Sequence, residues 1–318
     1  MTVPQGVTAL ESYTFNECPV LTAASLPDGL TSIGDSAFYA CAALQTIALP
    51  QSLTSLGESA FERCAALTEL TLPEGLTRIG DWAFSECTAL TGIAVPASVT
   101  EIGYAAFSFC PALRAITVAA ENPSYSSDAL GVLFDKEKTT LIAAPGRLHG
   151  NYDVPTGVTT IDYAAFAFCK ELTMLTIPVS VTNILSEAFD YCDALRGIFV
   201  AEGNAYYSSD VSGVLFNKTQ TDLVRCPGGY LGNYTAPDTV THVKAYAFDH
   251  CGRLTTVTFP ASLESIGGYV FFCCDALKGV YLRGNAPFRL KRDTLFVTLD
   301  AETGEEQRLT GVSVYRLD

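Results

Sequence analysis

Cysteine is the residue in this chain whose type and spacing first suggest chemistry. Nine of its eleven cysteines recur at steps of 23 residues, interrupted twice by a step of 59. In stacked units, equivalent residues lie about 4.8 Å apart with parallel side chains, whereas disulfide Cβ atoms lie only about 3.5–4.5 Å apart. We therefore expect buried thiols packed as small hydrophobic groups, and no metal, because no C-x-x-C motif or matching histidine pair is present. The nine are Cys18, Cys41, Cys64, Cys87, Cys110, Cys169, Cys192, Cys251 and Cys274.

The other candidate catalytic groups form no recognisable site. Three histidines, His149, His242 and His250, match no Ser–His–Asp order, metal motif or nucleotide-binding loop. The Ser-Ser-Asp triplets at 126–128 and 208–210 could form a nucleophile or cation site. They are more typical of turn residues that satisfy nearby backbone groups. We expect no enzyme activity and no cofactor.

The cysteines belong to a 23-residue repeat. Residues 27–49 read PDGLTSIGDSAFYACAALQTIAL, and residues 50–72 read PQSLTSLGESAFERCAALTELTL. Proline, phenylalanine and leucine keep the same step as cysteine across nine units, as at Pro27, Phe38 and Leu44. Such a period indicates a solenoid, in which stacking buries faces that one unit cannot bury alone.

Each unit divides into two halves. Its L-x-x-I-x-L segment, such as 44–49, suits a short strand that the following proline ends. Its I-G-x-x-A-F-x-x-C segment, such as 33–41, has apolar spacings of three and four that predict a short helix. Glycines such as Gly34 are expected to allow a tight entry to that helix. The predicted fold is an α/β repeat, a right-handed solenoid with a parallel sheet on one face and short helices on the other.

The order of these residues resembles a known family. The strand pattern is that of leucine-rich repeats, and I-G-x-x-A-F-x-x-C-x-x-L closely resembles the BspA-like leucine-rich repeat family of bacterial and protist surface proteins. The resemblance covers nearly the whole chain. It departs at Glu11 and Thr14 in the first unit, and at Asp162, Leu185 and Lys244, which replace glycine. It implies a cell-surface or extracellular location and adhesion to a protein or glycan of a host or another microbe.

Two 36-residue inserts, at about 119–154 and 201–236, account for the longer steps. They match each other, and GVLFDKEKTTLIAAP and GVLFNKTQTDLVRCP each read as two strands around a polar turn. We expect a hairpin projecting from the solenoid in each insert. Residues 1–318 then form one leucine-rich repeat domain, with nine repeats over 4–282 and a C-terminal cap over 283–318, with strands near 294–298 and 311–316.

Composition restricts the class of partner. The chain is 48% hydrophobic and 17% charged, with a formal net charge of −15. The acidic balance disfavours nucleic acid as a partner, and no apolar run reaches the roughly 20 residues of a transmembrane helix. The N-terminus lacks the pattern of a signal peptide, which we expect to have been removed. We expect a monomer.

Side chains that vary between repeats are the best candidates for binding. Exposed aromatic and arginine side chains commonly anchor interfaces, although these residues could equally pack on the inserts. A second aromatic set, including Trp82, Tyr104, Tyr163 and Tyr246, lies on the predicted helix side and could pack between repeats or contact a partner. The alternative function is a spacer that presents another domain. The predicted binding residues are Arg114, Met174, Arg196, Phe199, Lys278 and Tyr281.

Overall fold

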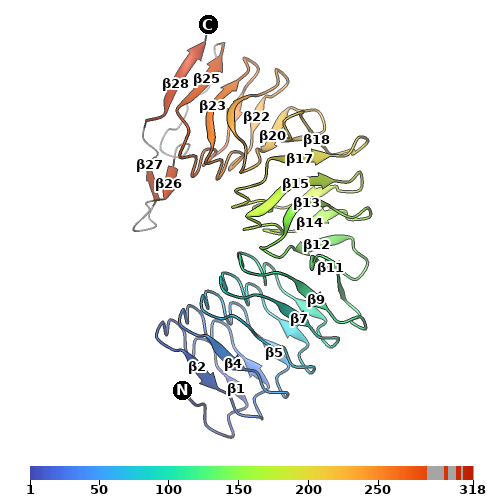
Figure 1. The fold of residues 1–318 in the computed structure, drawn as a ribbon, viewed down its shortest axis with the longest axis vertical. Helices are drawn as coiled ribbons and strands as arrows, with labels where there is room; N and C mark the ends of the chain where they lie inside the picture. The colour runs from blue at the N-terminus through green and yellow to red at the C-terminus, as the bar shows by residue number, and fades with distance from the viewer. Residues whose placement is uncertain (285–296, 300–305, 309–310, 318) are drawn as a thin grey trace. The chain divides into compact units, whose positions relative to one another are not determined.

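The computed structural model describes residues 1–284, 297–299, 306–308 and 311–317 (Figure 1). Its chain forms two compact units. Unit 1 comprises Met1–Leu148, Val158–Cys169 and Ile184–Phe189, and unit 2 comprises His149–Gly157, Lys170–Asn183 and Asp190–Asp318. Both are built from short, mostly parallel strands linked by turns. That the whole chain is one domain stays a prediction.

Unit 1 contains the predicted strand of the repeat and a second one that the sequence reading missed. The predicted strand pairs in parallel between neighbouring repeats, as β2 (Ala23–Ser25) with β4 (Thr46–Ala48) and β7 (Ile93–Val95) with β9 (Ile116–Val118). A second parallel ladder is made of two-residue strands just before the glycine position. Its members are β1 (Ala9–Leu10), β3 (Ser32–Ile33), β5 (Ser55–Leu56), β6 (Arg78–Ile79) and β8 (Glu101–Ile102).

The predicted short helices are wrong, because the described residues contain no helix. The segment 34–41 forms consecutive turns in which Ser36 and Ala40 have φ of 52° and 53°, outside the helical range. The amides of Ala37, Tyr39 and Cys41 donate to carbonyls three residues earlier. The apolar residues of this segment therefore owe their spacing of three and four to successive tight turns. These turns bury one face of the segment, as a helix would.

Alternate amides of the same segment donate to the next repeat instead. The N–H groups of Ser36, Phe38 and Ala40 donate to the carbonyls of Glu58, Ala60 and Glu62 at 2.7, 2.9 and 2.8 Å. In an α-helix, the amides beyond the first turn donate within the segment instead. The turn arrangement thus hydrogen-bonds one repeat to the next on this side of the coil as well as along the strands.

The recurring glycine is required by close approach and not by helix entry. Gly80 has ordinary backbone angles, but a Cβ atom there would lie 2.4 Å from the carbonyl carbon of Gly57. Gly57 and Gly103 meet the preceding repeat at similar distances, through Asp35 and Asp81. The backbones of adjacent repeats therefore touch at Gly57, Gly80 and Gly103, which leaves no room for a side chain at these positions.

Phenylalanine and cysteine form the interior of each coil, as predicted. In unit 1, the rings of Phe38, Phe61 and Phe84 stack at centroid distances of 5.2 and 5.7 Å. The Cys64 and Cys87 thiols are buried and donate to the carbonyls of Phe38 and Phe61 at 3.2 and 3.1 Å. Burial raises the pKa of the Cys87 thiol well above its usual value. The position favours cysteine because a thiol is small and apolar yet can donate to this carbonyl.

The first insert forms the predicted hairpin, but the hairpin is paired into the solenoid. β11 (Leu133–Asp135) pairs antiparallel with β10 (Tyr125–Ser127) and β12 (Thr140–Ala143). β12 then pairs in parallel with β14 (Thr160–Ile161) of the following repeat, which places it in the short-strand ladder. The same sheet includes β16 (Asn183–Ile184). Leu133, Phe134 and Leu141 are fully buried, so the insert adds to the core.

The second insert repeats this arrangement in unit 2. Its β19 (Leu215–Asn217) pairs antiparallel with β18 (Tyr207–Ser209) and β20 (Asp222–Arg225). β20 pairs in parallel with β22 (His242–Val243), and β22 pairs with β24 (Ser265–Ile266). The Ser-Ser-Asp triplets have the predicted capping role. Ser209 accepts from the amide of Val200, and Asp210 accepts from the amide of Val214.

Unit 2 also contains two sheets of longer parallel strands. One comprises β13 (His149–Asp153), β15 (Glu171–Ile177) and β17 (Gly197–Val200). The other comprises β21 (Gly232–Thr235), β23 (Leu254–Phe259), β25 (Gly279–Arg283) and β28 (Ser313–Leu317). β26 (Val297–Leu299) pairs antiparallel with β27 (Glu306–Arg308). Residues 285–296, within the expected cap, lie outside the described residues.

Candidate binding surfaces

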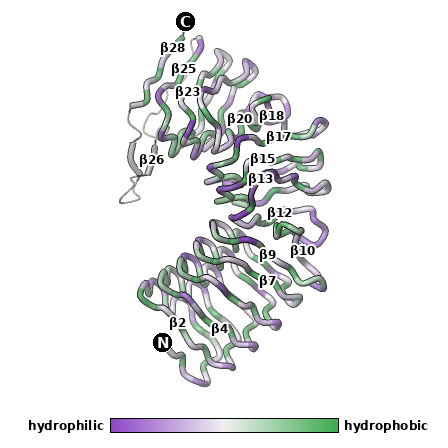
Figure 2. The backbone as a smooth tube through the Cα atoms, in the orientation of Figure 1, coloured by the Kyte–Doolittle hydropathy of each residue, from purple (hydrophilic) through white to green (hydrophobic). Residues whose placement is uncertain are grey.

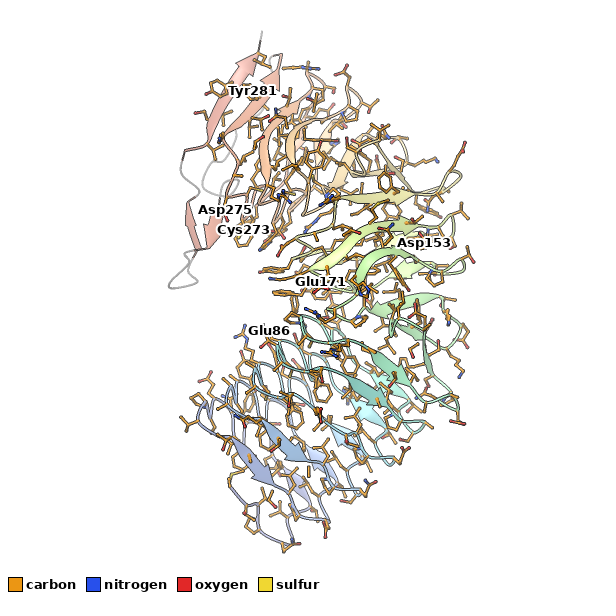
Figure 3. The ribbon with its side chains drawn as sticks, in the orientation of Figure 1. Glu86, Asp153, Glu171, Cys273, Asp275 and Tyr281 are labelled. Atoms are coloured by element: carbon orange, nitrogen blue, oxygen red, sulfur yellow. The ribbon has the colours of Figure 1, made fainter. Side chains whose placement is uncertain are left out.

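The outward face of the first long-strand sheet of unit 2 carries Met174, one of the predicted binding residues, as an exposed side chain. Met174 on β15 is 39% exposed and lies in register between Asn151 on β13 and Gly197 on β17. One step along the strands, Thr176 pairs in register with Asp153 and Phe199. Asp153 is exposed at the edge of this sheet (Figure 3). The face is polar apart from Met174 and Phe199.

Phe199 and Tyr281 are only partly exposed, because each packs across glycines. A Cβ atom at Gly197 would lie 2.4 Å from the Phe199 ring, and one at Gly213 of the second insert would lie 3.1 Å from it. The Tyr281 ring lies over Gly279 and stacks on Tyr315 of β28 at 4.8 Å (Figure 3). Packing on the insert therefore occurs for Phe199, and packing on the last strand occurs for Tyr281.

The three basic residues occupy the position just after the repeat leucine and are exposed. The amides of Arg114, Arg196 and Lys278 donate to the carbonyls of Thr91, Thr173 and Thr255. Within the described part of the chain, none of their side chains forms an ion pair. Arg196 thus neighbours β15, whereas Arg114 belongs to unit 1.

The second aromatic set stacks between adjacent repeats. In unit 1, Tyr104 lies 5.6 Å from Trp82 and 4.5 Å from Tyr163. In unit 2, Tyr246 stacks on Tyr269 at 5.5 Å. Tyr104 and Tyr246 remain 39% and 44% exposed. Packing between repeats is therefore observed for this set, and partner contact stays a prediction.

A buried charged cluster in unit 2 was missed by the sequence reading. Arg225 of β20 lies 3.0 Å from Asp190 and 3.4 Å from Asp249, and all three residues are at most 9% exposed. Arg225 also donates to the carbonyl of Tyr246 at 3.0 Å. Comparison of the two inserts could have revealed it, because the equivalent positions around the first insert hold Ser108, Ala143 and Ala167.

The described residues contain no group of three or more His, Cys, Asp or Glu side chains arranged to hold a metal ion. They also contain no helix long and apolar enough to cross a membrane. Figure 2 shows the alternation of hydrophobic and hydrophilic stretches along each coil of unit 1.

Comparison with known families explains the repeat. A family model described as "BspA type Leucine rich repeat region (6 copies)" matches residues 1–130, 149–219 and 228–288. The chain belongs to the BspA-type leucine-rich repeat family. The internal stretches that this BspA-type model leaves unmatched, 131–148 and 220–227, fall inside the two inserts. A comparison with curated proteins finds no match.

Solved structures share the fold. The pneumococcal vaccine antigen PcpA is 21% identical with a TM-score of 0.68, over 100% of this chain and 78% of that one. A leucine-rich repeat protein from Eubacterium ventriosum is 21% identical with a TM-score of 0.64, over 100% and 83%. A leucine rich cell surface protein from Faecalibacterium prausnitzii is 26% identical with a TM-score of 0.54, over 89% and 87%. The parallel-sheet solenoid of leucine-rich repeat type is thus common to all four.

Proposed function

We propose that this chain is a non-enzymatic adhesion module that binds a protein or glycan of a host or another microbe at the bacterial cell surface. The observation that carries the proposal is the open strand face of unit 2, where Met174 and Arg196 are both exposed on neighbouring repeats. Membership of the BspA-type family and similarity to a protein named as a cell surface protein support the location.

The proposed contact surface lies on unit 2 and comprises side chains of two kinds. Arg196 and Lys278 supply exposed positive charge there on an otherwise acidic protein, and Arg114 is a separate exposed basic residue of unit 1. Phe199 and Tyr281 present half-buried rings that glycines hold in place. Rigid aromatic groups lose little conformational freedom on binding, which suits them to interface anchors.

The test is a binding measurement with the isolated chain. Immobilised mucin glycans and immobilised host matrix glycoproteins are exposed to the chain, and saturable binding to one of them is expected. Met174→Glu together with Arg196→Glu should weaken that binding at least tenfold. The control is Arg63→Glu, which changes an exposed arginine paired with Glu86 at 3.1 Å on the turn side of unit 1.

A spacer function is the second candidate. It predicts no saturable binding to either surface, with unchanged melting of both variants. If Arg63→Glu weakens binding as much as the double variant does, the loss follows from the change in net charge. That result would refute the assignment of binding to the strand face of unit 2.

A further inference from the structure

The strand face of unit 2 carries the same arrangement of side chains twice. One copy lies on β13, β15 and β17, and the other lies on β21, β23 and β25. Each copy has an asparagine on its first strand, a basic residue just before its third strand and an aromatic ring on that third strand. Platform 1 comprises Asn151, Arg196 and Phe199, and platform 2 comprises Asn233, Lys278 and Tyr281.

The asparagine of each platform is oriented by hydroxyl groups of the next strand. In platform 1, the Thr173 hydroxyl donates to Oδ1 of Asn151 at 3.0 Å. In platform 2, the hydroxyls of Thr255 and Thr256 donate to Oδ1 of Asn233 at 2.5 and 2.8 Å. The strand register shifts just before each asparagine, as at a β-bulge, which redirects a side chain. Both asparagines are exposed, so their Nδ2 groups remain as hydrogen-bond donors for a ligand.

The aromatic ring of each platform is supported by a glycine of its own strand. A Cβ atom at Gly197 would lie 2.4 Å from the Phe199 ring, and one at Gly279 would lie 3.1 Å from the Tyr281 ring. Each glycine precedes its ring by two residues and therefore lies on the same side of the strand. Both rings are partly exposed. Each ring is thus fixed in place and still accessible, which suits it to stack on the C–H groups of a sugar ring.

The basic residue of each platform is connected to the threonine that holds the asparagine. The amides of Arg196 and Lys278 donate to the carbonyls of Thr173 and Thr255, both at 2.8 Å. Both basic residues are exposed. On a chain with a net charge of −15, two exposed cations at equivalent positions favour a negatively charged ligand.

The repeat itself does not require these side chains. In the other seven repeats, the position of Phe199 and Tyr281 holds serine, alanine or threonine. Arg114 is the one further basic residue at the position of Arg196, but Thr117 replaces the ring in its repeat, which belongs to unit 1. Asparagine, cation and ring therefore occur together in the two platforms alone, and stacking of the repeats does not explain the combination.

We propose that each platform binds an acidic sugar, a pyranose that bears a carboxylate or sulfate group, within a surface glycan. Arg196 or Lys278 pairs with the anionic group, the asparagine Nδ2 donates to a hydroxyl oxygen, and the aromatic ring stacks on the C–H groups of the sugar. This inference rests on the proposed function, because it names the ligand class of the same strand face. A polysaccharide with repeating acidic units offers a sugar to each platform.

The test is surface plasmon resonance of the full-length chain on three immobilised polysaccharides. Hyaluronan carries carboxylates, heparin carries sulfates as well, and dextran is uncharged. We expect saturable binding to hyaluronan or heparin that weakens as salt is raised, and none to dextran. Binding to hyaluronan would identify the carboxylate as sufficient, whereas binding to heparin alone would identify sulfate as the recognised group. The absence of binding to both charged polymers would overturn the proposal.

Paired variants test the two platforms together, with circular dichroism as the check of folding. Arg196→Gln with Lys278→Gln should weaken binding at least about tenfold, because each variant removes a charge-assisted hydrogen bond. Asn151→Ala with Asn233→Ala should weaken it about threefold to tenfold through loss of neutral hydrogen bonds. The matched control is Arg114→Gln, which removes an exposed cation at the same repeat position without a platform. It should change binding by less than about twofold.

The outcomes separate this inference from the proposed adhesion function. A loss in Arg114→Gln as large as in the paired basic variant would show attraction by net charge alone and would overturn the platforms. Unchanged binding in the asparagine variant would overturn them too. Saturable binding to a deglycosylated matrix protein, abolished by Met174→Glu with Arg196→Glu, would preserve the adhesion function even if neither charged polysaccharide binds. No binding to any of these surfaces would refute both proposals.

Discussion

Replacing one repeat glycine by alanine tests directly how the repeats are stacked. At Gly80 the added Cβ would lie 2.4 Å from the Gly57 carbonyl carbon, 2.5 Å from its oxygen and 2.6 Å from the Glu58 nitrogen. All three are backbone atoms, so no side chain can rotate away. The repeats must separate instead.

Separation strains the hydrogen bonds that join these two repeats. The amide of Gly80 donates to Leu56 at 3.0 Å, and that of Ser59 donates to Asp81 at 2.7 Å. Overpacking costs about 1–3 kcal/mol, and each weakened hydrogen bond adds about 1 kcal/mol. We expect Gly80→Ala to lower the free energy of unfolding by about 3–5 kcal/mol.

The assay is guanidinium denaturation followed by circular dichroism, with Gly92→Ala as the matched control. Gly92 also has an ordinary backbone, but the nearest atom to its added Cβ would be the Ala115 oxygen at 3.9 Å. The control should change stability by less than about 1 kcal/mol. A Gly80→Ala cost as small as that of Gly92→Ala would refute the argument that backbone contact selects glycine.

Three further predictions concern the core and the buried charges. Phe61→Ala should cost about 3–5 kcal/mol in denaturant melts. Phe15→Ala should cost less, because Phe15 is partly exposed and, among the described residues, stacks on Phe38 alone; equal costs would argue against the stacked core. Arg225→Ala should cost about 3–5 kcal/mol because it removes the buried charge that pairs with the carboxylates of Asp190 and Asp249, and adding Asp190→Ser with Asp249→Ala should recover most of that loss. If stability does not recover in this triple variant, the residue types around the first insert cannot replace the charged cluster of the second. The folded-state pKa of His250, about 10, exceeds its unfolded value of about 6.5, so its stabilisation is complete below pH 6.5 and is lost as pH rises through 10. The melting temperature should therefore fall more between pH 7 and 10 in the unmodified chain than in His250→Phe, and parallel curves would contradict this.

The exposure of the candidate binding residues was predictable from the sequence, whereas their packing partners were not. Met174, Arg196 and Lys278 are exposed, as expected for positions that lie between the apolar residues of the repeat. The packing of Phe199 on Gly213 and of Tyr281 on Tyr315 could not be read from the repeat. Each contact joins segments that are not equivalent positions of neighbouring repeats, and only folding brings these segments together.

By itself, the sequence determined that the chain is a solenoid of stacked 23-residue units with a core of phenylalanine and cysteine, because periodic residues in a stack must meet their own equivalents. Only the tertiary structure decided how the non-strand half of each unit is built. Spacings of three and four fit both a helix and successive turns, and the choice depends on whether amides donate within the unit or to the next one. It also decided that Arg225, Asp190 and Asp249 form one buried cluster, because charges from separate repeats become partners only when the stack places them within hydrogen-bond distance.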